Sequence, residues 1–465
     1  MKKILTDKIF HIIIITILAV GIFLRFKYFL VFRWLWADEL SLLQNIFHAS
    51  PINVFNHLAG EQASPPLFLL FTKFILFLFE PLTKYYVQTA RFVPFIASII
   101  SIPAFYLLTK KYLRKKICLI TANCMFCLNL HLIYFSQDFK QYSSDVCIFI
   151  LVLLSYFYLN INKLSNKSIL GLSLFYVICS WFSFTSILAA TAVIAVMFSA
   201  TPPKSNLKKF LLLSVPFIIS SILLYINQHY LLESKALTSF WENGFIHSYY
   251  PLSFFQVLYN AIQYYLCCNN FYINTVYILI FIFSIIKLSL KFKNAKSQIL
   301  LLPLLFAFLA SILKIYPFYL RTALYIYPII IILFLYPFES IKLKYKYISR
   351  NNLFDFITYT ICIITIFFTI KYQNIFTFTL PNLKIPLSIY LKQNKSETLV
   401  MNRFDSYTYD FYNNLYKFDN NKTIIYIEDF SKTSLNRLPA GKTYYLINSI
   451  SNEHPDLTSL KYRQK

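Results

Sequence analysis

The chain has 465 residues, of which 58% are apolar, 19% aromatic and only 14% charged. A soluble protein carries roughly a quarter charged residues, whereas here apolar stretches long enough to cross a bilayer recur from residue 9 to about 374. This composition excludes a soluble globular enzyme, a disordered chain and a disulfide scaffold. It leaves the net charge of +25 to be explained by membrane topology or by nucleic acid.

Eleven membrane-spanning helices are predicted in chain order. Nine stretches are clear: 9–31, 90–109, 117–136, 146–161, 209–226, 271–290, 298–315, 322–338 and 354–374. The stretch 168–200 lies between two basic loops and fits two shorter spans that meet near Ser183–Ser186. The first apolar run is too long for a signal peptide and no small-residue cleavage site follows it, so we interpret it as an uncleaved span.

The basic residues predict the orientation of these spans. Six short segments hold 21 of the 44 Lys and Arg residues: 1–8, 110–116, 162–167, 204–209, 287–296 and 342–350. The alternating loops 32–89, 137–145, 227–270 and 316–321 hold few. Because cytoplasmic loops collect Lys and Arg, the N-terminus and the first set are expected inside. The net charge therefore reflects the topology of a protein embedded in membrane lipids. It gives no reason to expect nucleic acid as a partner.

The same rule decides an ambiguous apolar stretch at 65–79. Counting it as a span would place the basic segment 110–116 outside, and the stretch is short and carries Lys73. We therefore predict an interfacial helix on the outer surface. The first outer loop, 32–89, is then long and helical within itself.

The composition changes after residue 374. Segments 397–401, 423–428 and 443–448 read as short strands, and 405–417 reads as a helix between the first two. This pattern predicts a small α/β domain over 375–465, after a transmembrane domain over 1–374. With eleven spans the α/β domain lies outside. It shows no Gly-rich nucleotide fingerprint, so no nucleotide cofactor is expected.

Two adjacent carboxylates, Asp38 and Glu39, follow the first span within a few residues. A solvated loop with an aromatic belt would explain them on their own. The alternative is a general base or a ligand for a divalent metal at the membrane face, because carboxylate oxygens accept protons and suit Mg²⁺ or Mn²⁺.

A second polar cluster, 134–145, separates two lipid spans and contains Asp138, Lys140 and Tyr142. Such polar density is costly against lipid, so we expect it to face a water-filled cavity, although an ordinary polar turn remains open. Arg321 and, more weakly, Arg91 stand at span ends. Each could snorkel to the headgroups or bind a lipid phosphate through the planar guanidinium.

The outer loop 227–270 carries His229, Glu233, Glu242 and His247. Their spacing matches no metal motif, and a plain loop is the preferred interpretation.

The order of these features resembles a known family. Asp38-Glu39 after span one, Ser64-Pro-Pro-Leu before an apolar helix, the stretch Ser136–Tyr142 after span three and a late Arg321 are similar to polyprenol-dependent glycosyltransferases of the GT-C superfamily. Bacterial glycosyltransferase family 39 is the most similar group, and the resemblance covers roughly residues 9–340. Protein O-mannosyltransferases and the lipid A aminoarabinose transferase belong to the wider group.

The resemblance implies roles for particular residues. Asp38 would be catalytic, with Glu39 beside it, and Asp138 would match the second-loop acid. Arg321, Lys140, Arg91 and Tyr142 would contact the donor phosphate, although relatives often have Arg where this chain has Lys140, and His or Lys where it has Ser64. Some relatives bind a divalent metal (Mg, Mn or Zn) near the Pro-Pro-Leu motif, for which Glu61 and Asp138 are the candidates.

The expected function is therefore an integral membrane glycosyltransferase of the bacterial cytoplasmic membrane. It would move a sugar, with inversion, from a polyprenyl-phosphate donor to a hydroxyl of a lipid, glycan or protein on the outer face. The competing interpretation is a transporter or flippase, or a polymerase or ligase, of lipid-linked saccharides. A transporter would place polar residues deep within its spans and often shows repeated halves, whereas here the carboxylates gather at one face.

Overall fold

The structure is a computed structural model. It describes residues 2–31, 35–47, 50–60, 62–79, 86–161, 163–199, 203–247, 250, 252–266, 271–340 and 359–367, together with four strands after residue 397.

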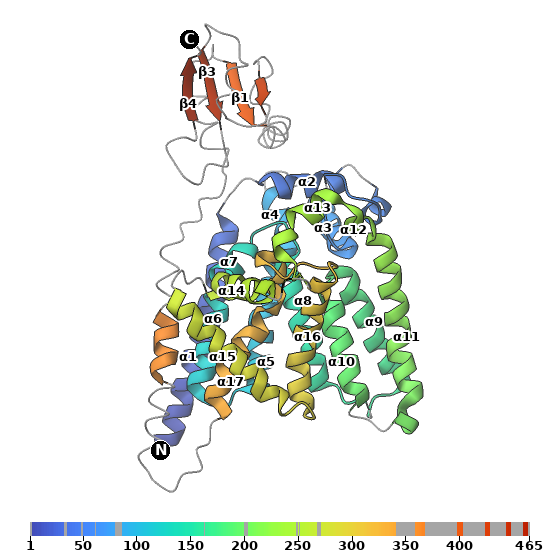
Figure 1. Cartoon of the computed structure of the whole chain (residues 1–465), viewed down its shortest axis with the longest axis vertical. Helices are drawn as coiled ribbons and strands as arrows, with labels where there is room; N and C mark the ends of the chain where they lie inside the picture. The colour runs from blue at the N-terminus through green and yellow to red at the C-terminus, as the bar shows by residue number, and fades with distance from the viewer. Residues whose placement is uncertain are drawn as a thin grey trace.

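Helices make up most of the described chain (Figure 1). In order they are α1 Lys2–Leu30, α2 Ala37–Phe47, η1 Pro51–Phe55, α3 Pro66–Leu78, α4 Tyr86–Ala90, α5 Phe92–Tyr112, α6 Lys116–Cys127, α7 Leu130–Phe135, α8 Tyr142–Tyr158, α9 Asn166–Phe182, α10 Ser186–Ser199, α11 Pro203–Gln228, α12 Tyr230–Glu233, α13 Lys235–Phe240, η3 Glu242–Gly244, α14 Leu252–Leu266, α15 Phe271–Ser289, α16 Ala295–Ile312, η4 Leu320–Ile326 and α17 Tyr327–Ser340.

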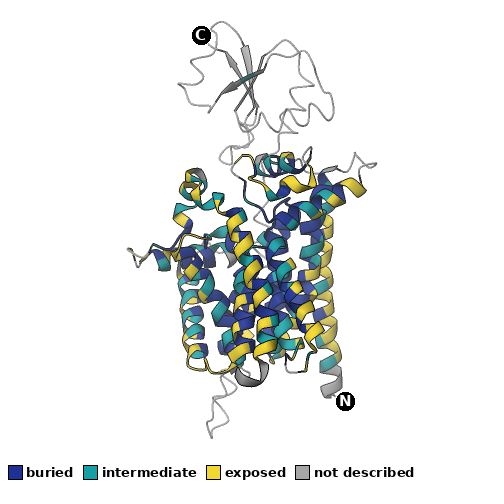
Figure 2. Ribbon diagram, turned by 90° about the vertical axis from the view of Figure 1, so that its right-hand side faces the viewer, coloured by how far each residue is buried: buried dark blue, intermediate teal, exposed yellow. Residues whose placement is uncertain are grey.

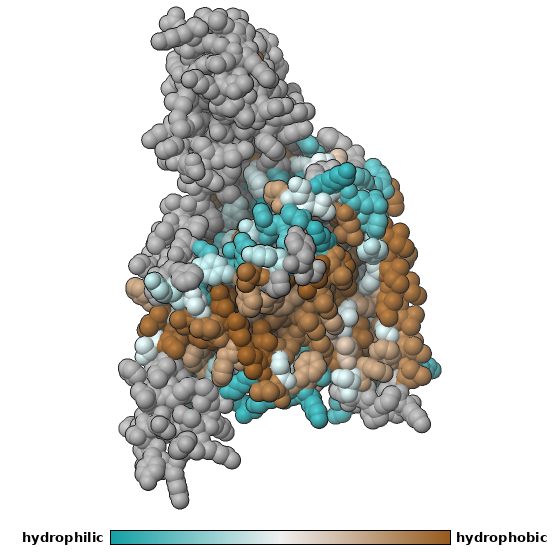
Figure 3. Space-filling model, in the orientation of Figure 1, coloured by the Kyte–Doolittle hydropathy of each residue, from teal (hydrophilic) through white to brown (hydrophobic). Residues whose placement is uncertain are grey.

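The helical bundle has the character of a multi-pass membrane protein. Within the described residues, six helices are long and apolar enough to cross a bilayer, and four more are shorter and apolar. Large apolar side chains such as Ile15 (64% exposed) and Leu279 (61%) lie on the outward helix faces, where Figure 2 shows exposed residues around a buried interior. Figure 3 shows the same surface as an apolar band between two polar ends. Such a surface is stable only against lipid.

One predicted span is interrupted in the structure, and another is described only in part. The stretch 117–136 is divided into α6 and α7, because Asn129 caps the second helix by accepting a hydrogen bond from the Leu132 amide at 3.0 Å. Its side-chain amide also donates to the Tyr327 hydroxyl at 3.1 Å. Of the last predicted span, 354–374, only residues 359–367 are described, as a helix. The count of eleven therefore remains a prediction, while the break near Ser183 is confirmed between α9 and α10.

The basic segments that were predicted to share a side are in mutual contact. Lys116 forms a salt bridge with Asp7, the Tyr112 hydroxyl donates to the Lys296 carbonyl at 3.2 Å, and Lys209 Nζ donates to the Ile161 carbonyl at 3.2 Å. The segments 1–8, 110–116 and 287–296 thus meet at one end of the bundle, and Lys209 and Ile161 form a separate pair. The basic segment 342–350 lies outside the described residues.

The opposite end is built from the predicted outer loops. Helices α2, α3, α4, α12 and α13 gather there (Figure 1), so the first outer loop is helical as expected. The predicted outer loop 227–270 contains the helices α12, α13, η3 and α14. Helix α3 has 13 residues, which at 1.5 Å per residue is too short to span a bilayer. A small core under this end includes Leu40, Leu43, Phe68 and Phe139.

Four strands form a sheet in the C-terminal region: β1 Thr398–Asn402, β2 Ile424–Ile427, β3 Thr443–Ile447 and β4 Ser459–Arg463. Their order is β2-β1-β3-β4. Strands β2 and β3 pair parallel to β1, with Leu399 opposite both Ile424 and Tyr445, and β4 pairs antiparallel to β3. Three strands coincide with the expected ones, and β4 was not expected. The predicted helix 405–417 lies outside the described residues, so the α/β domain as a whole remains a prediction.

Candidate functional site

A buried ion pair joins the start of α2 to the start of α5. Arg91 donates to Glu39 through Nε (2.7 Å to Oε1) and Nη2 (2.5 Å to Oε2), a two-point geometry that suits a guanidinium and a carboxylate. Glu39 also accepts from the backbone amides of Phe139 (2.7 Å) and Trp36 (3.1 Å). Each oxygen of this fully buried carboxylate thus has two donors, and Glu39 ties three segments together.

The second outer loop is fastened to the first through Trp36. The indole Nε1 of Trp36 donates to Oδ1 of Asp138 at 3.0 Å. Asp138 is fully buried, and its loop is continuous with Phe139, whose amide binds Glu39. Asp138 therefore helps to fix the position of the second outer loop relative to the first.

Asp38 occupies the more open side of the same cluster and approaches the buried Lys140. The Asp38 carboxylate lies 4.0 Å from Lys140 Nζ, and Lys140 also donates to the Gln62 side-chain oxygen at 2.6 Å. Burial lowers the pKa of Lys140, and the nearby Asp38 charge opposes that shift. Asp38 stands in the first turn of α2, where the helix dipole favours a negative charge.

Arg321 completes the cluster, although it lies 283 residues from Asp38 in the sequence. Its Nη2 donates to Asp38 Oδ2 at 3.3 Å. The guanidinium carbon lies 5.6 Å from the ring centre of Trp36, 5.8 Å from that of Tyr142 and 5.5 Å from that of Trp241. These distances are typical of cation–π contacts, so ring faces rather than ion pairs hold most of this side chain.

Burial divides the cluster into two layers. The side chains of Glu39 and Arg91 are 0% and 4% exposed, whereas those of Asp38 and Arg321 are 32% and 22% exposed. A ligand arriving from outside therefore meets Asp38, Arg321 and the aromatic rings first. The Glu39–Arg91 pair supports this surface from beneath.

The structure brings together seven of the eight predicted site residues: Asp38, Glu39, Arg91, Asp138, Lys140, Tyr142 and Arg321. The eighth, Glu61, lies outside the described residues. The next residue, Gln62, is described, and its side-chain oxygen accepts a hydrogen bond from Lys140.

Of the two predicted metal ligands, Asp138 and Glu61, the structure describes Asp138. No group of three or more His, Cys, Asp or Glu side chains with metal-binding geometry occurs among the described residues. Asp138 Oδ1 accepts from an indole N–H, and the open carboxylate Asp38 already faces two cations. We therefore derive no step through a metal.

Three contributors were not assigned to the site from sequence. Trp36 adjoins the acidic pair, which is the one local signal that marks it. Gln62 and Trp241 carry no local signal, because Gln62 approaches Lys140 across 78 residues and Trp241 approaches Arg321 from a separate loop.

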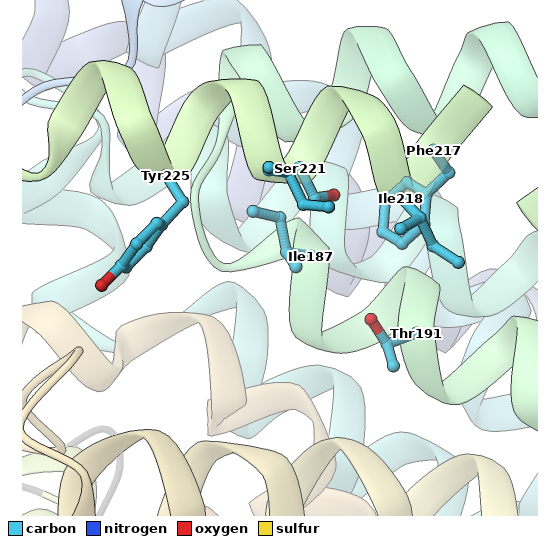
Figure 4. A pocket seen from close by; sticks show the side chains of 7 residues that line it. Ile187, Thr191, Phe217, Ile218, Ser221 and Tyr225 are labelled. Carbon is cyan, nitrogen blue, oxygen red and sulfur yellow. The ribbon is translucent and has the colours of Figure 1, made fainter. Parts of the chain in front are cut away.

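An apolar groove of about 260 Å³ lies apart from this chemistry, between α10 and α11 (Figure 4). Its walls are Ile187, Thr191, Phe217, Ile218, Ser221, Ile222 and Tyr225. It contains no charged side chain, and Ile218 and Ile222 are half exposed. The groove is thus suited to an acyl or prenyl chain and supplies no catalytic group.

Comparison with known proteins adds no assignment: no family model matches the chain, and no curated protein matches it.

Proposed function

We propose that the protein is a membrane glycosyltransferase that uses a polyprenyl-phosphate sugar, and that Asp38 and Arg321 are its central residues. The observation that carries the proposal is an open carboxylate flanked by two cations at the polar end of an apolar bundle. Sugar transfer from a lipid phosphate requires a base for the acceptor, cations for the leaving group and a lipid-compatible surface.

The leaving phosphate is the natural ligand of Arg321 and Lys140. Among the described contacts, Arg321 makes one hydrogen bond, of 3.3 Å, to a carboxylate, whereas a guanidinium has five N–H donors. Its remaining donors therefore suit phosphate oxygens. A bound phosphate would compete with Asp38 for both cations, and Asp38 would then be released toward the acceptor.

The transfer step follows from that exchange. Asp38 takes the proton of the acceptor hydroxyl as its oxygen bonds to the anomeric carbon. The bond from that carbon to the phosphate oxygen breaks, and its electron pair stays on the lipid phosphate. Arg321 and Lys140 stabilise the charge that develops there, and a single displacement inverts the anomeric centre.

The remaining predicted residues receive supporting roles in this proposal. Glu39 and Arg91 satisfy each other in the buried layer, so we assign them to positioning α2 rather than to catalysis or phosphate binding. Asp138 fixes Trp36, and Tyr142 flanks Arg321. The acceptor is a lipid, glycan or protein hydroxyl.

We further propose that the site faces the outside of a bacterial cytoplasmic membrane, with eleven spans, a cytoplasmic N-terminus and an exterior C-terminal domain. Support comes from the basic segments, which meet at the end of the bundle remote from the cluster.

Mass spectrometry of envelope glycans tests the proposal. A deletion strain is complemented with the wild-type gene, with Asp38→Asn, or with Asp7→Asn, which removes an exposed acid at the opposite end. We expect one sugar to be lost in the deletion, restored by wild type and Asp7→Asn, and not restored by equally expressed Asp38→Asn. Full restoration by Asp38→Asn would refute the assignment of the base. An unchanged glycan profile in the deletion would refute transferase activity.

A further inference from the structure

The segment 241–247, between α13 and α14, covers the cluster although the sequence offered no reason to include it. It begins with Trp241, which follows the last residue of α13, and continues through η3. The segment itself is attached to residues 311–318, and the helices that precede it are attached to the first outer loop.

One attachment joins the segment to the chain that leads into Arg321. The Gly244 carbonyl accepts from the Phe318 amide at 2.9 Å, and Ser311 Oγ lies 3.3 Å from the same carbonyl. The Ile246 amide donates to Ser311 Oγ at 3.1 Å. Phe318 lies three residues before Arg321, so the segment contacts the stretch of chain that leads directly into the arginine.

Glycine is required at this contact. A Cβ on Gly244 would lie 2.7 Å from the Cβ of Tyr319 and 3.2 Å from the Cβ of Pro317. Both neighbours are atoms close to the backbone and cannot swing away. An added methyl group must therefore push the segment from its place.

The other attachment joins the preceding helices to the first outer loop. Asn227 Nδ2 donates to the Phe55 carbonyl at 2.7 Å, and the Leu58 amide donates to the Tyr230 hydroxyl at 3.4 Å. The ring centres of His57 and Tyr230 lie 4.1 Å apart, with the ring planes tilted by 38°. The segment thus contacts the chain that leads into Arg321, and the helices before it contact the first outer loop, which also carries Asp38.

We propose that Trp241 is a positioning residue of the anion site, and that segment 241–247 belongs to the substrate-binding machinery. This proposal rests on the proposed function. Trp241 closes an aromatic box with Trp36 and Tyr142 around the Arg321 guanidinium. The box holds the cation by ring faces, so its N–H donors stay available for a phosphate.

Removal of the Trp241 ring opens one wall of this box. The guanidinium then has more rotational freedom, and its existing contact with Asp38 competes better against an incoming anion. Both effects weaken phosphate binding without touching the base. We therefore expect an effect on affinity for the donor rather than on the rate of transfer at saturation.

The experiment measures binding of C55 polyprenyl phosphate, without sugar, to the purified full-length protein in detergent. Compared with wild type, Trp241→Leu should weaken binding roughly fivefold to thirtyfold, and Trp241→Phe should restore most of it, because a phenyl ring keeps the cation–π contact. Gly244→Ala should weaken binding to a similar extent. The matched control is Gly171→Ala, since a Cβ there meets no atom within 4 Å.

Three outcomes are informative. Weaker binding in Trp241→Leu and Gly244→Ala, with Trp241→Phe and Gly171→Ala near wild type, supports the proposal. Unchanged binding in Gly244→Ala and Trp241→Leu, while Arg321→Ala binds weakly, refutes the role of the segment and leaves the proposed function intact. Unchanged binding in Arg321→Ala refutes the phosphate site itself. If Trp241→Leu does not fold, Gly244→Ala with its glycine control decides the question.

Discussion

The Glu39–Arg91 pair allows a quantitative test of the buried layer. Arg91→Met removes the guanidinium and leaves the Glu39 charge buried beside the backbone amides of Phe139 and Trp36. Glu39→Gln leaves the Arg91 charge buried without a carboxylate. The N–H₂ group of the new side chain would also face N–H donors that now bind Glu39. Breaking one side of a buried pair costs about 3–5 kcal/mol, so each single variant should lose about that much of its free energy of unfolding.

The double variant Glu39→Gln/Arg91→Met distinguishes an ion pair from two independent residues. The double variant carries neither buried charge, so its loss should be close to that of one single variant, which gives a coupling energy of about 3–5 kcal/mol. The free energy of unfolding can be measured in mixed micelles by titration with SDS, followed by circular dichroism. If the two losses add to within about 0.5 kcal/mol, the reasoning is refuted.

An exposed pair provides the control for this cycle. Lys314 Nζ lies 3.1 Å from Glu242 Oε1, and both side chains are about half exposed. Solvent screens such a pair, so the cycle with Lys314→Met and Glu242→Gln should give a coupling energy below about 1 kcal/mol. Equal coupling in the two cycles would show that burial does not set the energy.

Three further predictions concern other parts of the molecule. Burial lowers the pKa of Lys140, so its charge is present below that pKa and lost as pH rises through it. Binding of polyprenyl phosphate should therefore fall with rising pH, and Lys140→Arg should abolish this decline. An equal decline in wild type and Lys140→Arg would contradict this role of Lys140. EDTA should leave the binding of polyprenyl phosphate unchanged, since the Asp138 carboxylate accepts a hydrogen bond from Trp36. Loss of binding in EDTA that added Mg²⁺ or Mn²⁺ reverses would show that a metal takes part. Gly21→Ala should lower the free energy of unfolding by about 1–3 kcal/mol, because its Cβ would lie 2.7 Å from that of Cys127, and equal stability in wild type and Gly21→Ala would refute this packing.

The amino-acid sequence determined the class of protein and the distribution of its charge. Apolar runs and basic segments are local properties, and lipid imposes the same requirement on each span, so the helical bundle and the meeting of the basic segments could be predicted. The break near Ser183 followed from length alone. The interruption at Asn129 was not predicted; besides the local cap, Asn129 donates a hydrogen bond to Tyr327, 198 residues away, and that contact has no signal in the local sequence.

Tertiary structure decided the division of labour within the site. Asp38 and Glu39 are neighbours in sequence, but successive residues of a helix point about 100° apart. Glu39 therefore meets Arg91 and two backbone amides in the interior, while Asp38 meets Arg321, 283 residues away, at the accessible surface. Composition made both acids conspicuous, and only the packing of distant segments separated the open carboxylate from the buried one.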